Sequence, residues 1–263
     1  MKDRKLKMNA GKTKIMVIGS NVRTIGNELG QEVLFGNSTV VLSEKERNLG
    51  FIFDSKLSLA NQINKVKQKA INGLVNISHI SSLIDKNHRL QLVHSLIFSH
   101  IDFCNSLYYG LPNTELHPLQ MILNSAARLV VNLPRFSQVR ITPICIQLHF
   151  LPVKARIEFK ICLLVYKALK YGQPSYLSEL LQPYEHESTV QLRSRGRLKE
   201  PIISNLANSE RCFEYYAPRL YNKLPNEVKM QNTVPTFKQK LKTHIFEKAY
   251  NLSEHGINAS YSV

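Results

Sequence analysis

Basic side chains at two places in the chain have the types and the spacing to bind phosphate groups. Lys65 and Lys69 lie four residues apart, so on a helix both would project from one face. The second place is a polar, strongly basic stretch near residues 187–201, which contains Arg193, Arg195, Arg197 and Lys199. Lysine and arginine neutralise backbone phosphates and release bound counterions. The pattern therefore predicts nucleic-acid binding.

The composition of the chain supports this prediction. The 263 residues carry a formal net charge of +16, with 35 Lys and Arg against 19 Asp and Glu. A small domain needs a charge of only about 2–8 for solubility. The hydrophobic fraction of 43% and the charged fraction of 21% are typical of a folded globular chain. No apolar run approaches the roughly 20 residues of a membrane span, so we expect no membrane partner.

Carboxylates for metal-dependent phosphoryl transfer are scattered rather than clustered. Only four of the nineteen acidic residues are aspartates, and no two of them are adjacent: Asp3, Asp54, Asp85 and Asp102. A two-metal site needs several carboxylates close together to hold Mg²⁺. We therefore expect no catalytic residue, metal ligand or cofactor site in this chain.

Two short motifs could bind a phosphate or a metal, but each has a structural interpretation that fits better. Gly11-Lys12-Thr13 matches the end of a P-loop, yet Leu6 stands where the first glycine is required and the segment leads into a strand. His100 and Cys104 have the spacing of two zinc ligands on a helix, but Cys104 falls on the apolar face of that helix. We interpret Cys104 as a core cysteine. The widely spread cysteines fit an intracellular, reducing compartment.

The elements that position these residues change in type near residue 55. Residues 12–54 predict strands: an apolar run at 14–18, a hairpin of 33–35 and 39–42 around Gly36-Asn37-Ser38, and a strand at 49–53. The basic N-terminal segment has no apolar stretch behind it, so we expect no secretory signal.

The pattern becomes helical at Leu57 and stays so to about Val131. Apolar residues at steps of three and four predict a helix from Leu59 to Ile77, a second from Leu90 to Tyr108 closed by Gly110, and a third from Leu116 to Val130. Later helices are predicted at 153–171 and 237–250, the first of them ended by Gly172. The expected fold class is α+β, mainly α, with a small N-terminal antiparallel β element before a three-helix bundle and a helical C-terminal domain.

Six blocks in order over residues 8–250 resemble the reverse transcriptases of non-LTR (LINE-type) retrotransposons, in the branch of the Jockey and chicken-repeat elements. Asn9–Gly19 resembles the "LNxxKTE" block with its hydrophobic strand, and Arg47–Ser58 resembles the "NLGVxFDSxLS" block. The later blocks are Ser99–Pro112, Leu119–Leu129, Leu148–Val153 and Ala217–Pro225. One departure is Lys14, which stands where the family often has Glu.

The resemblance implies a domain order and a site. Residues 1–56 would be a palm remnant with a primer-grip-like hairpin, 57–135 a thumb-like bundle, 136–250 a C-terminal extension and 251–263 a flexible tail. Leu49, Gly50 and Phe51 would correspond to the primer grip, which holds the primer end. Lys65 and Lys69 would lie on the thumb helix that follows the nucleic-acid backbone. The catalytic "[FY]xDD" motif, which holds Mg²⁺ in the family, would lie upstream of residue 8.

Three functions are compatible with these residues. The first is a truncated reverse transcriptase fragment that has no polymerase activity and binds RNA or an RNA–DNA hybrid through its thumb and basic loop. The second is the C-terminal part of an active RNA-directed DNA polymerase whose palm and fingers precede this sequence. The third is a host protein-interaction module derived from the element. Primer extension by this chain alone separates the first two, and a protein partner without nucleic-acid affinity would favour the third.

Overall fold

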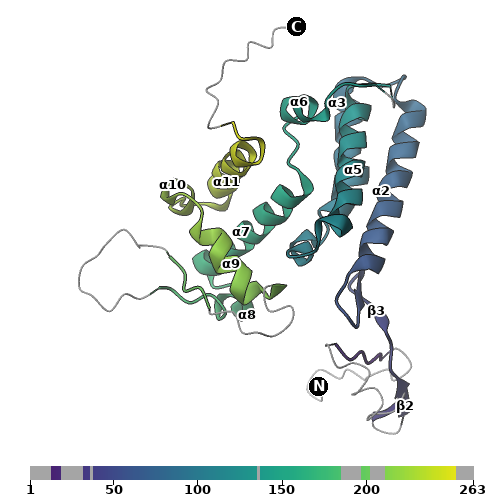
Figure 1. Cartoon of the computed structure of the whole chain (residues 1–263). Coiled ribbons are helices and arrows are strands. Elements are labelled where there is room, and N and C mark those ends of the chain that lie inside the picture. The colour runs from purple at the N-terminus through teal and green to yellow at the C-terminus, as the bar shows by residue number, and fades with distance from the viewer. Residues whose placement is uncertain are drawn as a thin grey trace. The chain divides into compact units, whose positions relative to one another are not determined.

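The structure is a computed structural model that describes residues 13–18, 32–35, 38–134, 137–184, 197–201 and 211–252. Within these ranges the chain is mainly helical, with two small antiparallel strand pairs near its N-terminus (Figure 1). The predicted class, α+β and mainly α, is confirmed at this level. The residues group into two compact units, 1–66 and 67–263.

The first unit contains two hairpins. β1 (Glu32–Phe35) pairs antiparallel with β2 (Ser38–Val41), which confirms the predicted hairpin; its Gly36-Asn37 turn lies outside the described residues. β3 (Lys45–Asn48) pairs antiparallel with β4 (Phe51–Asp54), and only the second of these strands was predicted. In the predicted strand at 14–18, Ile15 makes an isolated parallel bridge to Leu42.

Helix α2 (Ala60–Ile80) follows β4, and its apolar face agrees with the predicted periodicity. Ile63, Val66, Ala70 and Ile77 are all buried. Leu59 was predicted to be helical, but it has a φ of 60° and precedes the helix.

The predicted second helix, from Leu90 to Tyr108, is wrong as a continuous element. The segment instead consists of α3 (Lys86–Val93), a π-helical stretch η3 (His94–Phe98), α4 (Ser99–Ile101) and a 3₁₀ turn η4 (Asn105–Tyr108). Cys104 adopts a left-handed conformation with a φ of 52° and interrupts the helix. This change of direction accompanies the burial of Asn105 and Tyr108. Cys104 itself is half-buried, so its interpretation as a core residue is not met.

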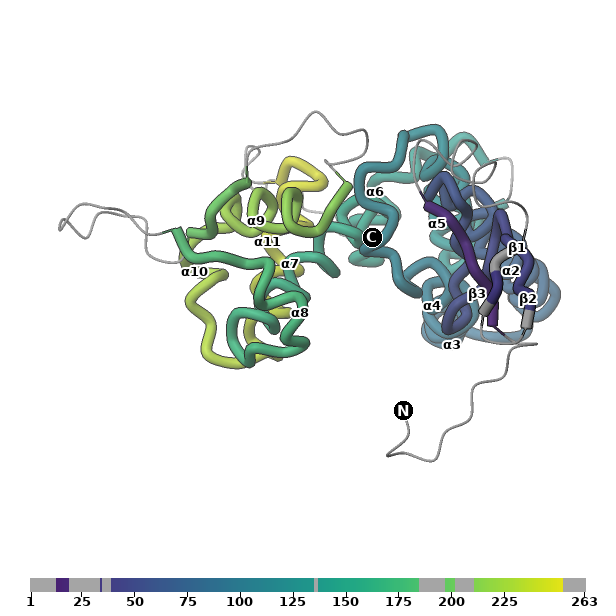
Figure 2. Tube along the Cα trace, turned by 90° about the horizontal axis from the view of Figure 1, so that it is seen from below, coloured from purple at the N-terminus to yellow at the C-terminus, as the bar shows by residue number. Residues whose placement is uncertain are grey.

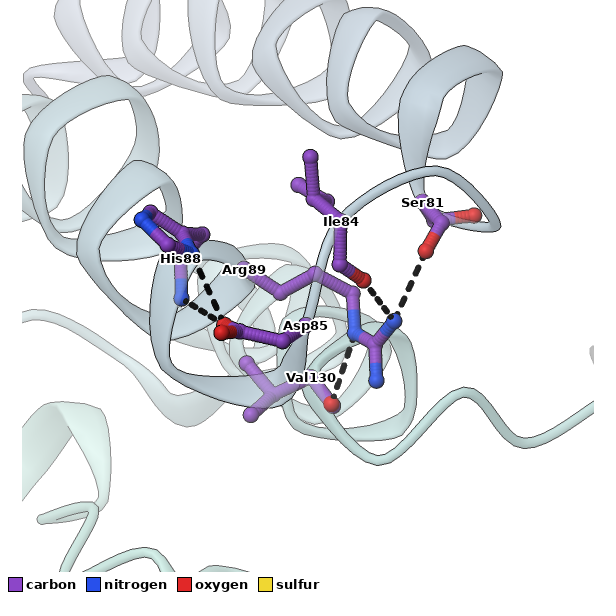
Figure 3. A network of polar contacts seen from close by, with 6 residues as sticks. All are labelled: Ser81, Ile84, Asp85, His88, Arg89 and Val130. Carbon is purple, nitrogen blue, oxygen red and sulfur yellow. Dashed lines mark hydrogen bonds and ion pairs between the residues drawn. The ribbon is translucent and has the colours of Figure 1, made fainter.

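Helix α5 (Asn113–Val130) confirms the third predicted helix and is tied to the start of α3 by Arg89. The guanidinium of Arg89 donates to the carbonyls of Ser81 and Ile84, both at 2.7 Å, and to the carbonyl of Val130 at 3.0 Å (Figure 3). One side chain therefore fixes the loop between α2 and α3 against the end of α5.

The long helix α7 (Val153–Tyr171) matches its predicted range and is buried along most of its length. It packs against α9 (Phe213–Asn222) and α11 (Val234–Tyr250), as Figure 2 shows. The α7–α11 contact includes Tyr166 and Phe237, whose rings stack 3.9 Å apart. The short helices are α6 (Ile141–Gln147), α8 (Ser175–Ser178) and α10 (Asn226–Lys229). Residues 253–263 of the expected tail lie outside the described residues.

Candidate nucleic-acid interface

The tip of the β3–β4 hairpin is a two-residue turn made by Leu49 and Gly50. Asn48 pairs with Phe51 across it, and both central residues have positive φ, 47° for Leu49 and 92° for Gly50. Two positive φ values are the hallmark of a type I′ turn, which normally selects Asn-Gly. A leucine at the first position is therefore strained, and its side chain is 94% exposed. Phe51, one residue after the turn, is 2% exposed and anchors the hairpin.

Two polar side chains attach the base of this hairpin to the start of α2. The Asp54 carboxylate accepts hydrogen bonds from the backbone N–H groups of Ser58 and Leu59 at 2.9 and 2.7 Å. The Gln62 side chain accepts one from the backbone N–H of Ile52 at 3.0 Å. Asp54 and Gln62 are both buried. The Phe-Asp-Ser block of the sequence therefore orients the hairpin, a role that spacing alone did not reveal.

Lys65 is directed at the hairpin tip. Its Nζ donates to the backbone carbonyl of Gly50 at 3.2 Å, and the side chain is half-buried. Lys65 was predicted to contact phosphate directly. The structure instead shows Lys65 in a structural role, because its hydrogen bond to Gly50 holds the strained turn against α2. The structure thus brings together four of the sequence-predicted residues within the first unit: Leu49, Gly50, Phe51 and Lys65.

Lys69 lies one turn further along α2 and is exposed. Its ammonium group acts on His100 of α4, a residue that was considered only as a metal ligand. Burial, and then the charge of Lys69, lowers the pKa of His100 below its ordinary value of 6.5. The Lys69 ammonium and the His100 ring therefore lie within electrostatic range of each other in the second unit.

The described part of the basic stretch includes Arg197, Leu198 and Lys199, and Leu198 forms an isolated antiparallel bridge with Pro183. Leu198 is buried, whereas Arg197 and Lys199 are exposed on either side of it. The segment pairs with residues 182–184, since Lys199 N donates to Gln182 O at 2.8 Å. The Asn222 side-chain amide accepts a hydrogen bond from the backbone N–H of Leu198 and donates one to the Leu198 carbonyl, both at 2.9 Å. Arg193 and Arg195 lie outside the described residues.

Positive charge gathers around this segment. Burial, and then the charge of Arg197, lowers the pKa of Lys229, a half-buried residue of α10. The Lys229 ammonium donates to the Asn222 carbonyl at 3.0 Å, which holds it in place. A phosphate at this surface would relieve repulsion among fixed cations.

Other chemistry is not supported by the described ranges. They contain no group of three or more His, Cys, Asp or Glu side chains arranged to hold a metal ion. They also contain no helix that is both long and apolar enough to cross a membrane. His100 and Cys104 do not share a helix, because α4 ends at Ile101, so the spacing of a zinc-ligand pair no longer applies.

Comparison with known proteins finds no matching family model, curated protein or solved structure.

Proposed function

We propose that this chain corresponds to the end of the palm, the primer grip, the thumb and the C-terminal extension of a non-LTR retrotransposon reverse transcriptase, and that it binds RNA or an RNA–DNA hybrid. The observation that carries the proposal is the β3–β4 hairpin. The segment that resembles the primer grip has an exposed two-residue tip, Leu49 and Gly50, and a lysine holds that tip in place.

Each residue proposed to bind nucleic acid has a role that its chemistry suits. Leu49 offers an exposed apolar surface to a sugar or base, and Gly50 allows the close approach of a backbone. Lys65 is a positioning residue. Lys69, Arg197 and Lys199 contact phosphates, together with Arg193 and Arg195 of the same basic stretch. Such contacts go mainly to the nucleic-acid backbone, so binding is only weakly dependent on sequence.

The polymerase step itself is not assigned to this chain. The donor set does not fit the Mg²⁺ ions of the family enzyme, because the four aspartates are scattered along the sequence with no adjacent pair. Catalysis would need the palm and fingers that precede these blocks in the family. The function proposed for the chain alone is therefore binding.

Salt-dependent binding tests the proposal. Affinity of the full chain for a short RNA–DNA hybrid should fall steeply as salt rises from about 50 to about 200 mM, because counterions are released on binding. Lys69→Gln and Lys199→Gln should each reduce the slope of log affinity against log salt by about one. Lys170→Gln, an equal loss of charge on an exposed residue of α7, is the matched control. Affinity that ignores salt over this range rejects the proposal.

A further inference from the structure

We propose that Lys69 and His100 form a phosphate-binding pair on the helical hairpin of α2 and α4, and that phosphate binding there is coupled to protonation of His100. The ligand is a backbone phosphate of the bound nucleic acid. This inference rests on the proposed function and adds to it a residue and a pH dependence.

The register of the two helices brings the pair together. α2 and the α3–α4 segment are joined by the short loop 81–85 and run in opposite directions (Figure 1). They come into close contact at Gly73, where an added Cβ would lie 2.9 Å from the Leu96 carbonyl oxygen. Lys69 is one turn before Gly73, and His100 is one turn after Leu96. In antiparallel helices these two steps lead in the same direction, so the register places Lys69 and His100 at about the same level of the hairpin.

The charges around His100 favour an anion. Lys69 on α2 is the charged group that acts on it, and it does so by repulsion. The nearby carboxylate of Asp102 is engaged by Arg156 of α7 at 2.7 Å. Lys69 is exposed and His100 is half-buried, so a phosphate group in solution can reach both.

A phosphate between the two side chains would change the direction in which the surroundings shift the pKa of His100. Without it, burial and the Lys69 charge keep the pKa of His100 below 6.5. An anion in contact with the ring favours the charged imidazolium and raises that pKa. By linkage, affinity for the anion must then increase as pH falls. Each unit by which the pKa rises corresponds to about a tenfold gain in affinity at low pH.

The test compares the binding of a short RNA–DNA hybrid between about pH 8 and about pH 5.5 at constant salt. The wild-type chain should bind several-fold more tightly at the acidic end, and His100→Gln should lose most of that gain. His117→Gln, a change at an exposed histidine of α5, is the matched control and should keep it. Thermal unfolding of each variant establishes that it is folded.

A second pair of variants tests the lysine. Lys69→Gln should weaken binding more than Lys67→Gln, which removes the same charge from a different face of α2. It should also raise the pKa of His100, followed by NMR of the imidazole in the absence of nucleic acid. Combined with His100→Gln, its effect on affinity should be less than additive, because both variants remove one contact.

The outcomes separate this inference from the function on which it rests. Salt-dependent binding whose pH dependence is unchanged in His100→Gln overturns the Lys69–His100 pair and leaves the proposed function intact. No binding of the hybrid at any pH or salt concentration rejects the proposed function and the inference together.

Discussion

Arg156 Nη1 donates a hydrogen bond to Asp102 Oδ2 at 2.7 Å, which joins two residues that are 54 positions apart. The same guanidinium lies 4.0 Å from the centre of the Phe98 ring and donates to the Leu151 carbonyl at 3.0 Å. Burial raises the pKa of the Asp102 carboxyl, and the charge of Arg156 opposes that rise. Asp102 belongs to the block at Ser99–Pro112 and Arg156 follows the block that ends at Val153. The Arg156 guanidinium therefore links Asp102 of the first block with the Leu151 carbonyl of the second.

Removal of Arg156 should destabilise the second unit. Arg156→Gln leaves Asp102 without its ion-pair partner and removes the contact with Phe98, at an expected cost of about 2–3 kcal/mol in the free energy of unfolding. Lys248→Gln is the control, because it breaks the exposed pair with Glu158 and should cost less than about 1 kcal/mol. Urea denaturation measures both. Equal losses in the two variants would contradict a structural role for Arg156.

His94 should make stability depend on pH. Burial, and then the charges of Arg156 and Lys242, lowers the pKa of His94 from 6.5. The unfolded chain therefore takes up this proton at a higher pH than the folded chain. Stability from this group is present above pH 6.5 and is lost as pH falls toward the folded pKa. His94→Gln should flatten the decline in unfolding midpoint between about pH 7.5 and about pH 5.5. An unchanged decline would assign the effect to other groups.

Gly73 should not tolerate a side chain, although it lies inside a helix. Alanine normally stabilises a helix by about 0.5–1 kcal/mol relative to glycine. At this position its Cβ would lie 2.9 Å from the Leu96 carbonyl oxygen, so the helices must separate. We expect Gly73→Ala to lower the melting temperature, whereas Asn72→Ala on the exposed neighbouring position should leave it unchanged or raise it slightly. Stabilisation by Gly73→Ala would show that the close approach is unimportant.

A substitution at Leu49 tests the stability of the turn and the binding of nucleic acid separately. Leu49→Asn places at the first turn position a residue that tolerates positive φ, so the hairpin should be as stable or more stable. It also removes the exposed apolar side chain, so affinity for an RNA–DNA hybrid should fall if Leu49 contacts the nucleic acid as proposed. Circular dichroism and binding at constant salt measure the two effects. Unchanged affinity with an intact hairpin would exclude Leu49 from the interface.

Primer extension tests the assignment of the chain as a binding element without polymerase activity. With no clustered aspartates in its sequence, the chain alone should incorporate no nucleotide above a heat-inactivated control, with Mg²⁺ and a primed RNA template supplied. Incorporation above that control would show that carboxylates distant in sequence assemble a site after all.

The amino-acid sequence by itself determined the class of the fold and the positions of its longest helices. Repeats of three and four residues located α2 and α5, and Gly172 marked the end of α7, because such signals act within a few residues of the chain. The same periodicity failed at Cys104. A left-handed residue there costs energy locally, and the burial of Asn105 and Tyr108, which follow it, became visible only in the packed structure.

The tertiary structure alone decided what the polar residues do. Lys65 and Lys69 look equivalent on a helical face, yet one bonds to the Gly50 carbonyl and the other lies beside His100. Asp102 forms an ion pair with Arg156, which belongs to α7. These roles depend on which elements approach each other and in what register, and packing sets both through contacts between residues far apart in the chain.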